Sequence, residues 1–182
     1  MINEFSVNPK PQNKSAKVAC LACLTVFAAA VVCYMTLAHY KGLIGLAAIV
    51  FLTVGIMIYT RYIAVKYYYD VTFDSESHAV LSVRQITGKR QTTLCCIYLS
   101  SIESITRQTR DERRAHKTPF GMRKYNYTPT LIPDVTYLVV SKSRIESCEI
   151  RLEITDELAG VLREYVAEAK ELAKMEEENE LY

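Results

Sequence analysis

The stretch that decides the fold is residues 18–65, which read VACLACLTVFAAAVVCYMTLA, then HYKG, then LIGLAAIVFLTVGIMIYTRYIAV. Two long apolar runs, 18–38 and 43–65, are separated by only four residues. About 20 apolar residues in helical form cross the roughly 30 Å hydrocarbon core of a membrane, and the first run supplies 21 without a charged side chain. Backbone in lipid must satisfy its own hydrogen bonds. The pattern therefore predicts two antiparallel helices that form a transmembrane hairpin over 18–65.

The cations that flank the two runs predict how this hairpin is oriented. Most of them lie on the side away from the joint: Lys10, Lys14, Lys17, Arg61 and Lys66. The joint itself holds only Lys41. Because Lys and Arg are enriched in cytoplasmic loops, we expect a multi-pass protein of the inner (plasma) membrane with both termini cytoplasmic. A signal peptide is the alternative for the first run, but its apolar core would be only roughly 7–15 residues long.

Length and charge divide the chain into three predicted parts. Residues 1–17 are polar and predict a flexible cytoplasmic tail, and residues 66–182 follow the hairpin as one cytoplasmic domain. That domain holds 17 Lys and Arg against 19 Asp and Glu, a net charge of −2, whereas the whole chain carries +2. We therefore expect no nucleic acid among its partners, since nucleic-acid binding typically needs a basic surface.

Small residues and cysteines in the two runs predict helix packing. One face of the first helix carries a stripe of small residues: Ala22, Thr25, Ala29, Cys33 and Thr36. Gly45, Ala48 and Gly55 form a similar line on the second helix, and such stripes allow close approach of helices. Cys20-x-x-Cys23 has redox spacing, but within a membrane helix it predicts a pair of packing residues. The six cysteines and three histidines predict no disulfide, metal site or cofactor.

After the membrane the apolar period changes from helical to two, which indicates strands. Strands are predicted at 66–74, 79–84, 92–99, 135–139 and 148–154. A short turn from Leu99 is predicted to lead into a further strand that ends near Gln108. The segment 92–99 is apolar on both faces, so we expect it to be covered on both sides. Thr155 is predicted to cap a long amphipathic helix whose apolar face packs on the sheet. The fold class is therefore α+β: a transmembrane hairpin, a small antiparallel barrel or sheet, and a C-terminal helix.

Four short motifs carry a resemblance to a known family. They are Tyr68-x-Asp70-Val71-Thr72, Leu81-x-Val83, Ile86-x-Gly88-Lys89-Arg90, and Ile97-x-Leu99-x-x-Ile102-x-x-Ile105. The segment 67–105 is similar to bacterial pleckstrin-homology-like (PH-like) domains that follow a pair of transmembrane helices. The resemblance implies a membrane-tethered binding module with no catalytic residue to carry over. The chain departs from that pattern in a long insert at 107–134.

The insert is predicted to be irregular, and it contains the sharpest charge feature of the domain, a net charge of +5 over residues 107–124. Its cations and rings are the candidate contacts for lipid or a partner: Arg107, Arg110, Arg113, Arg114, Lys117, Phe120, Arg123, Lys124, Tyr125 and Tyr127. Cations near anionic lipid gain about 1 kcal/mol each. The alternatives are an acidic protein partner, a solvated loop without a ligand, and an edge segment that packs the two tyrosines on the barrel.

The sequence contains no phosphate-binding Gly-rich loop, nucleophile elbow or His-x-x-x-His pair. We therefore expect a membrane-anchored, non-enzymatic module that binds a protein partner or anionic lipid headgroups at the inner membrane. The alternative is an accessory or regulatory subunit of a larger membrane transporter or envelope complex, assembled through the hairpin.

Overall fold

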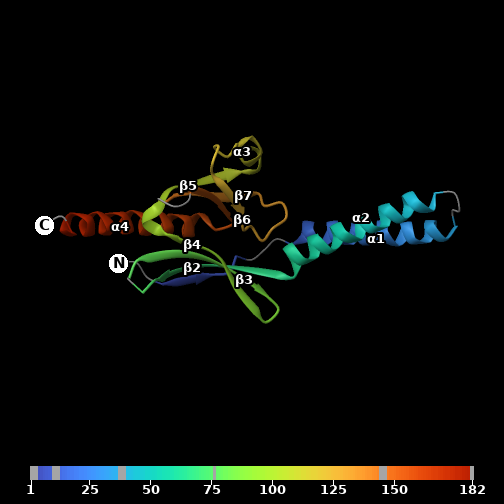
Figure 1. Ribbon diagram of the computed structural model, residues 1–182, viewed down its shortest axis with the longest axis horizontal. Coiled ribbons are helices and arrows are strands. Elements are labelled where there is room, and N and C mark those ends of the chain that lie inside the picture. The colour runs from blue at the N-terminus through green and yellow to red at the C-terminus, as the bar shows by residue number, and fades with distance from the viewer. Residues whose placement is uncertain (1–3, 10–12, 37–39, 76, 144–146, 181–182) are drawn as a thin grey trace. The chain divides into compact units, whose positions relative to one another are not determined.

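The computed structural model describes residues 4–9, 13–36, 40–75, 77–143 and 147–180. The flanking cation Lys10 therefore lies outside the described residues, and so do residues 37–39 of the predicted hairpin. The chain divides into two compact units. One contains residues 11–66 with 129–132, and the other contains the remaining residues, with the strands and the C-terminal helix (Figure 1).

The first unit is a pair of apolar helices in contact, as predicted. Helix α1 spans Lys14–Thr36 and helix α2 spans Lys41–Ile58, and a π-helical turn at Tyr59–Ile63 continues α2. Each apolar stretch is 23 residues long and is long and apolar enough to cross a membrane.

Small residues on α2 form the contact with α1. This confirms the predicted role of the small-residue line on the second helix. Gly55 and Ala48 are buried. A Cβ added at Gly55 would lie 3.3 Å from the Cβ of Cys23. The Cys20 thiol lies 3.8 Å from the backbone oxygen of Gly55. The two cysteines are therefore packing residues, also as predicted.

The predicted stripe on α1 is on the wrong face of that helix for this contact. Ala22, Thr25, Ala29, Cys33 and Thr36 are all exposed. The less exposed side chains of α1 follow a different line: Ala16, Ala19, Cys20, Cys23, Phe27 and Ala30. Neighbouring residues point about 100° apart around a helix, so the packing face lies beside the stripe. It was missed because it includes the large ring of Phe27.

The second unit contains two four-stranded sheets and a long helix. The first sheet has the order β1-β2-β3-β4, with the strands at Phe5–Val7, Val65–Phe73, Ala79–Thr87 and Arg90–Tyr98. A 3-10 turn at Leu99–Ser101 leads to β5. The second sheet has the order β5-β7-β8-β6, with the strands at Ile102–Thr109, Val135–Lys142, Ser147–Leu152 and Arg123–Asn126. Helix α3 spans Arg110–Ala115, and helix α4 spans Asp156–Glu180.

The N-terminal segment differs from the predicted flexible tail. Residues Phe5–Val7 form β1, which pairs antiparallel with β2 so that Phe5 lies opposite Val71. The Phe5 ring also lies 6.0 Å from the Tyr165 ring on α4. An apolar residue on each side of Ser6 suits a short edge strand. The polar residues around it concealed this signal.

The predictions for β4, for the irregular insert and for a wholly antiparallel sheet also need correction. Strand β4 was expected to be covered on both faces, but it lies at the end of its sheet and most of its side chains are exposed. Strand β6 lies within the supposedly irregular insert. It pairs parallel with β8, so the second sheet is not wholly antiparallel. Helix α3 also lies in the insert, and a reciprocal capping box between Thr109 and Glu112 begins it.

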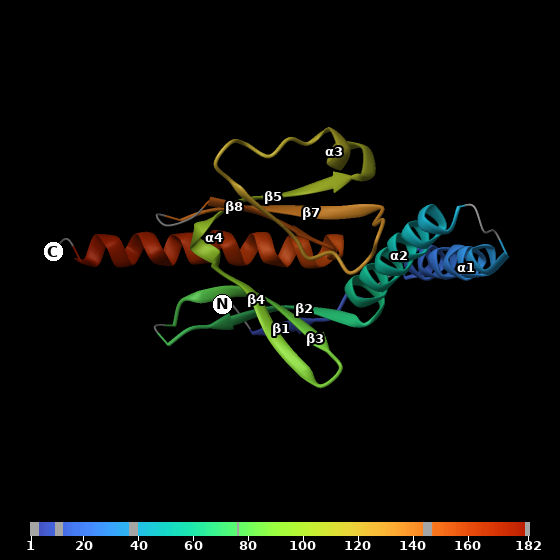
Figure 2. The same ribbon diagram turned by 45° about the vertical axis from the view of Figure 1, so that its right-hand side comes forward.

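The core of this unit lies between the sheets and α4, which passes along the gap between them in both views (Figure 2). Its largest buried side chains come from β2, β5, β7, β8 and the 3-10 turn: Tyr67, Tyr69, Tyr137, Leu99, Ile102, Ile150 and Leu152. Thr155 caps α4 as predicted, since its side-chain oxygen accepts a hydrogen bond from the Leu158 amide at 3.3 Å. The exposed Val161 and Leu172 lie outside the buried face of α4.

One charged pair is buried in the first sheet. Asp70 on β2 is 1% exposed and accepts a hydrogen bond from the guanidinium of Arg84 on β3. The hydrogen bond to Asp70 raises the pKa of Arg84, against the effect of burial. A buried carboxylate needs such a partner, because an unpaired buried charge is strongly destabilising.

Candidate functional site

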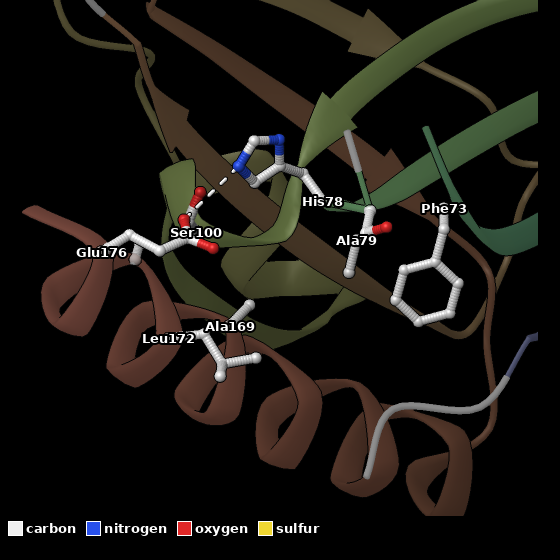
Figure 3. Close-up of a pocket in the computed structure, with 9 residues that line it drawn as sticks. Phe73, His78, Ala79, Ser100, Ala169, Leu172 and Glu176 are labelled. Carbon is white, nitrogen blue, oxygen red and sulfur yellow. Dashed lines mark ion pairs between the residues drawn. The ribbon is translucent and has the colours of Figure 1, made fainter. Parts of the chain in front are cut away.

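A small cavity lies between α4 and the turn that joins β2 to β3 (Figure 3). His78 and Glu176 are at its mouth, 3.5 Å apart, and the His78 ring meets the Tyr98 ring edge-on at 6.0 Å. The cavity measures about 60 Å³. A water molecule takes about 30 Å³ in the liquid, so the space suits a few waters and does not suit a metabolite.

The insert forms a more substantial feature on the outer side of the second sheet. Its loop 116–122 and strands β5, β7 and β8 enclose an open hollow of about 560 Å³. Val140 and the Glu103–Lys142 ion pair line the hollow on the side of the sheet. Nζ of Lys142 lies 2.9 Å from Oε2 of Glu103. On the side of the loop are Phe120 and Met122.

A buried carboxylate holds the start of this loop against the sheet. Glu149 on β8 is 2% exposed. Its oxygens lie 3.0 and 3.1 Å from Nε2 of His116, and one of them accepts a 2.7 Å hydrogen bond from the Thr118 hydroxyl. Burial alone would raise the pKa of Glu149, but these hydrogen bonds outweigh it and the pKa lies below its ordinary value. The loop is therefore anchored two residues before its tip.

Phe120 is at that tip, and its side chain is fully exposed, at 108% of the reference area. Gly121 follows it with a positive φ of 86°, a conformation that glycine adopts without strain. Lys117, Arg123 and Lys124 lie near in sequence, and all three are exposed. The anchored loop thus presents an aromatic ring, with Lys117 three residues before it and Arg123 and Lys124 at the start of β6.

The structure places the ten predicted contact residues in different environments. Seven of them are exposed: Arg107, Arg110, Arg114, Lys117, Phe120, Arg123 and Lys124. Arg107 is half exposed, and its Nε lies 3.3 Å from the carboxylate of Asp156. Arg113 is partly buried, and burial, followed by the charges of the neighbouring Arg110 and Arg114, lowers its pKa.

Tyr125 and Tyr127 pack on the domain. This agrees with the alternative in which an edge segment packs the two tyrosines on the barrel. Their rings are stacked with centroids 6.0 Å apart, and Tyr127 is buried. The backbone oxygen of Tyr127 accepts a 2.9 Å hydrogen bond from the Tyr69 hydroxyl on β2. This contact fixes the end of β6 against the first sheet.

Sequence reasoning missed His116, Thr118 and Glu149, which shape the loop. Glu149 alternates with the buried Cys148 and Ile150, and in a half-buried strand such a position is normally exposed. The only available signal was a histidine inside a basic segment, which is too common to identify an anchor. Among the described residues, no group of three His, Cys, Asp or Glu side chains is placed to hold a metal ion.

Comparison with known proteins identifies the domain. A family model described as a bacterial PH-like domain (DUF6106) matches residues 4–170. The match covers most of the chain, and it includes the two apolar helices as well as the sheets. No curated protein and no solved structure matches the chain.

Proposed function

Because the chain belongs to the bacterial PH-like domain family, we propose that it is a membrane-anchored, non-enzymatic interaction module of the inner membrane. In this proposal α1 and α2 are the anchor, and the PH-like unit is cytoplasmic. The contact surface is loop 116–122 with the first two residues of β6, Arg123 and Lys124, and its ligand is the anionic headgroups of the membrane that anchors it. A protein that docks on the same loop is the competing outcome.

The pairing of β1 with β2 supports one feature of this topology. Strand β1 precedes α1 in the chain, β2 follows α2, and their paired residues belong to the same compact unit. Both ends of the hairpin must then lie on the same side of the membrane. Lys14 and Lys17 before α1, and Arg61 and Lys66 after α2, favour the cytoplasmic side. A cleaved first helix would also remove β1 from its sheet.

The observation that carries the proposed contact is the complete exposure of Phe120 on an anchored loop. A fully exposed aromatic ring costs free energy in water, and burial of such a side chain is worth about 1.5–3 kcal/mol. Lys117, Arg123 and Lys124 add the cations that attract an anionic surface. Because Glu149 already holds the loop, little conformational entropy is lost when the loop binds.

The chain contains no tryptophan, so F120W introduces a single fluorescent reporter at the loop tip. The full-length protein is reconstituted in vesicles of phosphatidylcholine alone or mixed with phosphatidylglycerol. We expect a blue shift of the emission, and quenching by brominated acyl chains, only in the anionic vesicles. High salt should reduce both effects, since it screens the cations.

L172W is the matched control, because Leu172 is an exposed apolar residue on α4. Its emission should be the same in both vesicles. Emission from F120W that is equally red-shifted in both lipids would refute the lipid contact. A red-shifted F120W emission that becomes blue-shifted only when cytosolic protein is added would favour the protein partner.

The exposed small-residue stripe of α1 favours a second candidate function, an accessory subunit that assembles through the hairpin. Thr25 and Thr36 donate their hydroxyl hydrogen bonds to carbonyls of their own helix, and the stripe is outside the contact with α2. A29L should then abolish co-purification with a membrane partner. V32L, on a neighbouring exposed position, is the control. An unchanged complex in A29L would exclude this function.

A further inference from the structure

Helix α3 has an unusual face toward the second sheet. The helix is six residues long, continues directly from β5 and packs against that strand. Arg113 is its one partly buried residue, and the others are exposed. A helix normally covers a sheet with apolar side chains. Here the inward residue is a cation, so burial of apolar side chains does not explain the position of α3.

The outer face of the second sheet carries a buried polar patch, which consists of Gln108, Thr136 and Arg151. Val140 of β7 lines the hollow on this face, and Leu138 and Thr136 share the face because side chains alternate along a strand. Arg151 of β8 lies opposite Leu138. Gln108 of β5 lies opposite Thr136. Each residue of the patch is at most 8% exposed, so three neighbouring strands direct polar side chains to one buried region.

Several atoms of this region lack the hydrogen bond that buried polar groups normally make. Nε and Nη2 of Arg151, Nη1 of Arg113 and the Thr136 hydroxyl are buried without a hydrogen-bond partner among the described residues. The amide oxygen of Gln108 is buried in the same way. The unmatched atoms are therefore mostly donors, with one acceptor in the same patch. A buried donor of a charged group is costly when it has no acceptor.

The two guanidinium groups also repel each other. Burial, followed by the positive charge of Arg113, lowers the pKa of Arg151, and the charge of Glu149 opposes both effects. Glu153 and Asp134 have the same opposing effect on the pKa of Arg113. These carboxylates balance part of the charge, but they accept no hydrogen bond from the unmatched atoms. An oxyanion between the two guanidinium groups would supply both the charge and the acceptors.

We propose that Arg113 and Arg151 bind a phosphate group that retains a proton, and that α3 covers this site. The phosphate oxygens accept hydrogen bonds from both guanidinium groups and from the Thr136 hydroxyl. The P–OH group donates to the amide oxygen of Gln108. Sulfate and phosphodiesters do not match this set of partners, because neither carries such a proton at neutral pH.

Two sources can supply this phosphate. Inorganic phosphate keeps a P–OH group at neutral pH, whereas a phosphate monoester loses most of it above a pKa of about 6. Inorganic phosphate therefore fits the patch better than the monoester headgroup of phosphatidic acid. The unmatched atoms are covered in this structure, so α3 lifts to admit the anion. Arg113 is then the one α3 side chain that leaves the sheet, and it carries its charge to the ligand.

This site is separate from the loop contact of the proposed function, because it uses neither Phe120 nor the cations of that contact. The phosphatidylglycerol of the vesicle test is a phosphodiester and is not a ligand of this site. The two proposals can therefore fail independently. F120W should retain phosphate binding in full.

The test is scanning calorimetry of the full-length protein in dodecyl maltoside at pH 6.5. Sodium phosphate and sodium sulfate are compared at equal ionic strength. Saturating phosphate should raise the melting temperature by at least about 3 °C, and sulfate should not. In a second arm, phosphatidic acid or phosphatidylglycerol is added to the micelles. A rise with phosphatidic acid and none with inorganic phosphate would support the same site and identify a lipid as the source.

R151M separates a binding role of Arg151 from a structural one. Replacement of a buried charge by an apolar side chain of similar size is often neutral or stabilising. In sulfate, R151M should therefore melt at or above the wild-type temperature, and it should lose the rise in phosphate. An arginine that only stabilises the fold would give a lower melting temperature in both salts, and that result would overturn the proposal.

R113Q is the second variant, and R114Q is its matched control on an exposed position of the same helix. R113Q should weaken phosphate binding at least about tenfold, since it removes a charged hydrogen-bond donor. R114Q should change the binding by less than about threefold. The proposal would be overturned by the absence of a rise with either phosphate source, by an equal rise in sulfate, or by equal binding in R113Q and R114Q.

Discussion

Removal of the Glu149 side chain should release loop 116–122 while the rest of the domain stays folded. E149A eliminates the acceptor of the 2.7 Å hydrogen bond from Thr118 and of the contacts to His116. Hydrogen bonds to a charged group are each worth about 1.5–3 kcal/mol. The His116 side chain is 24% exposed, so it regains water when the contact is lost. We therefore expect the free energy of loop opening to fall by about 2–3 kcal/mol.

Hydrogen exchange measured by mass spectrometry on the full-length protein in detergent reports this opening directly. Since 1.4 kcal/mol is a factor of ten in an equilibrium constant, amides in the loop should exchange about 30- to 100-fold faster in E149A. Amides of β2 and β3, which lie in the other sheet, should keep their rates. In vesicles, the emission of an E149A/F120W double variant should become broader and less sensitive to anionic lipid, because the ring is no longer preorganised.

E103A is the matched control, because it removes a carboxylate from the same hollow. The Glu103 and Lys142 side chains are each about half exposed, and an exposed ion pair contributes only about 0–1 kcal/mol. Its loop should exchange within a fewfold of the wild-type rate. Equal exchange rates in E149A and E103A would refute the reasoning that the buried carboxylate anchors the loop.

Three further outcomes follow from the same contacts. The slower loop exchange of wild type relative to E149A should be complete near neutral pH and disappear as pH falls below the ordinary pKa of 4.5, because the pKa of Glu149 is lowered in the folded protein. Hydrogen exchange measured across pH tests this. A difference in exchange rate that persists in acid would contradict it. R84M leaves the buried Asp70 without its partner, so the free energy of unfolding in urea should fall by about 3–5 kcal/mol, with R84K losing less. G55L forces α1 and α2 apart at a 3.3 Å contact and should cost about 1–3 kcal/mol, whereas G42A, which meets no atom within 4 Å, should leave the melting temperature in detergent unchanged.

The elements that could be predicted from the sequence are those with a strong period. The two apolar runs, the alternation in β2, β3, β7 and β8, and the capped α4 all follow from local patterns that packing reinforces. The Gly45–Ala48–Gly55 line of α2 was correct for the same reason. The α1 face was wrong because Phe27, a large residue, packs among small ones, so residue size alone did not identify the contact.

The remaining features depend on pairings between distant residues. Strand β1 is three residues long and acquires its strand structure only through β2, which lies beyond both helices in the sequence. Strand β6 pairs with β8 in parallel. A parallel pairing is not made by a hairpin turn, so no turn sequence could predict it. The exposure of 94–98 could not be read from composition, since an apolar run predicts a covered strand whether or not this chain itself supplies the cover.

In the proposed function, anchoring by the two helices changes the affinity that the loop needs. Three cations near an anionic surface contribute about 3 kcal/mol, and insertion of Phe120 adds about 2 kcal/mol. The total of about 5 kcal/mol corresponds to a dissociation constant of about 0.2 mM. Such binding would be weak for a free domain. A short tether gives an effective concentration in the millimolar range, which suffices to hold this loop on the membrane for much of the time. A contact this weak also remains reversible.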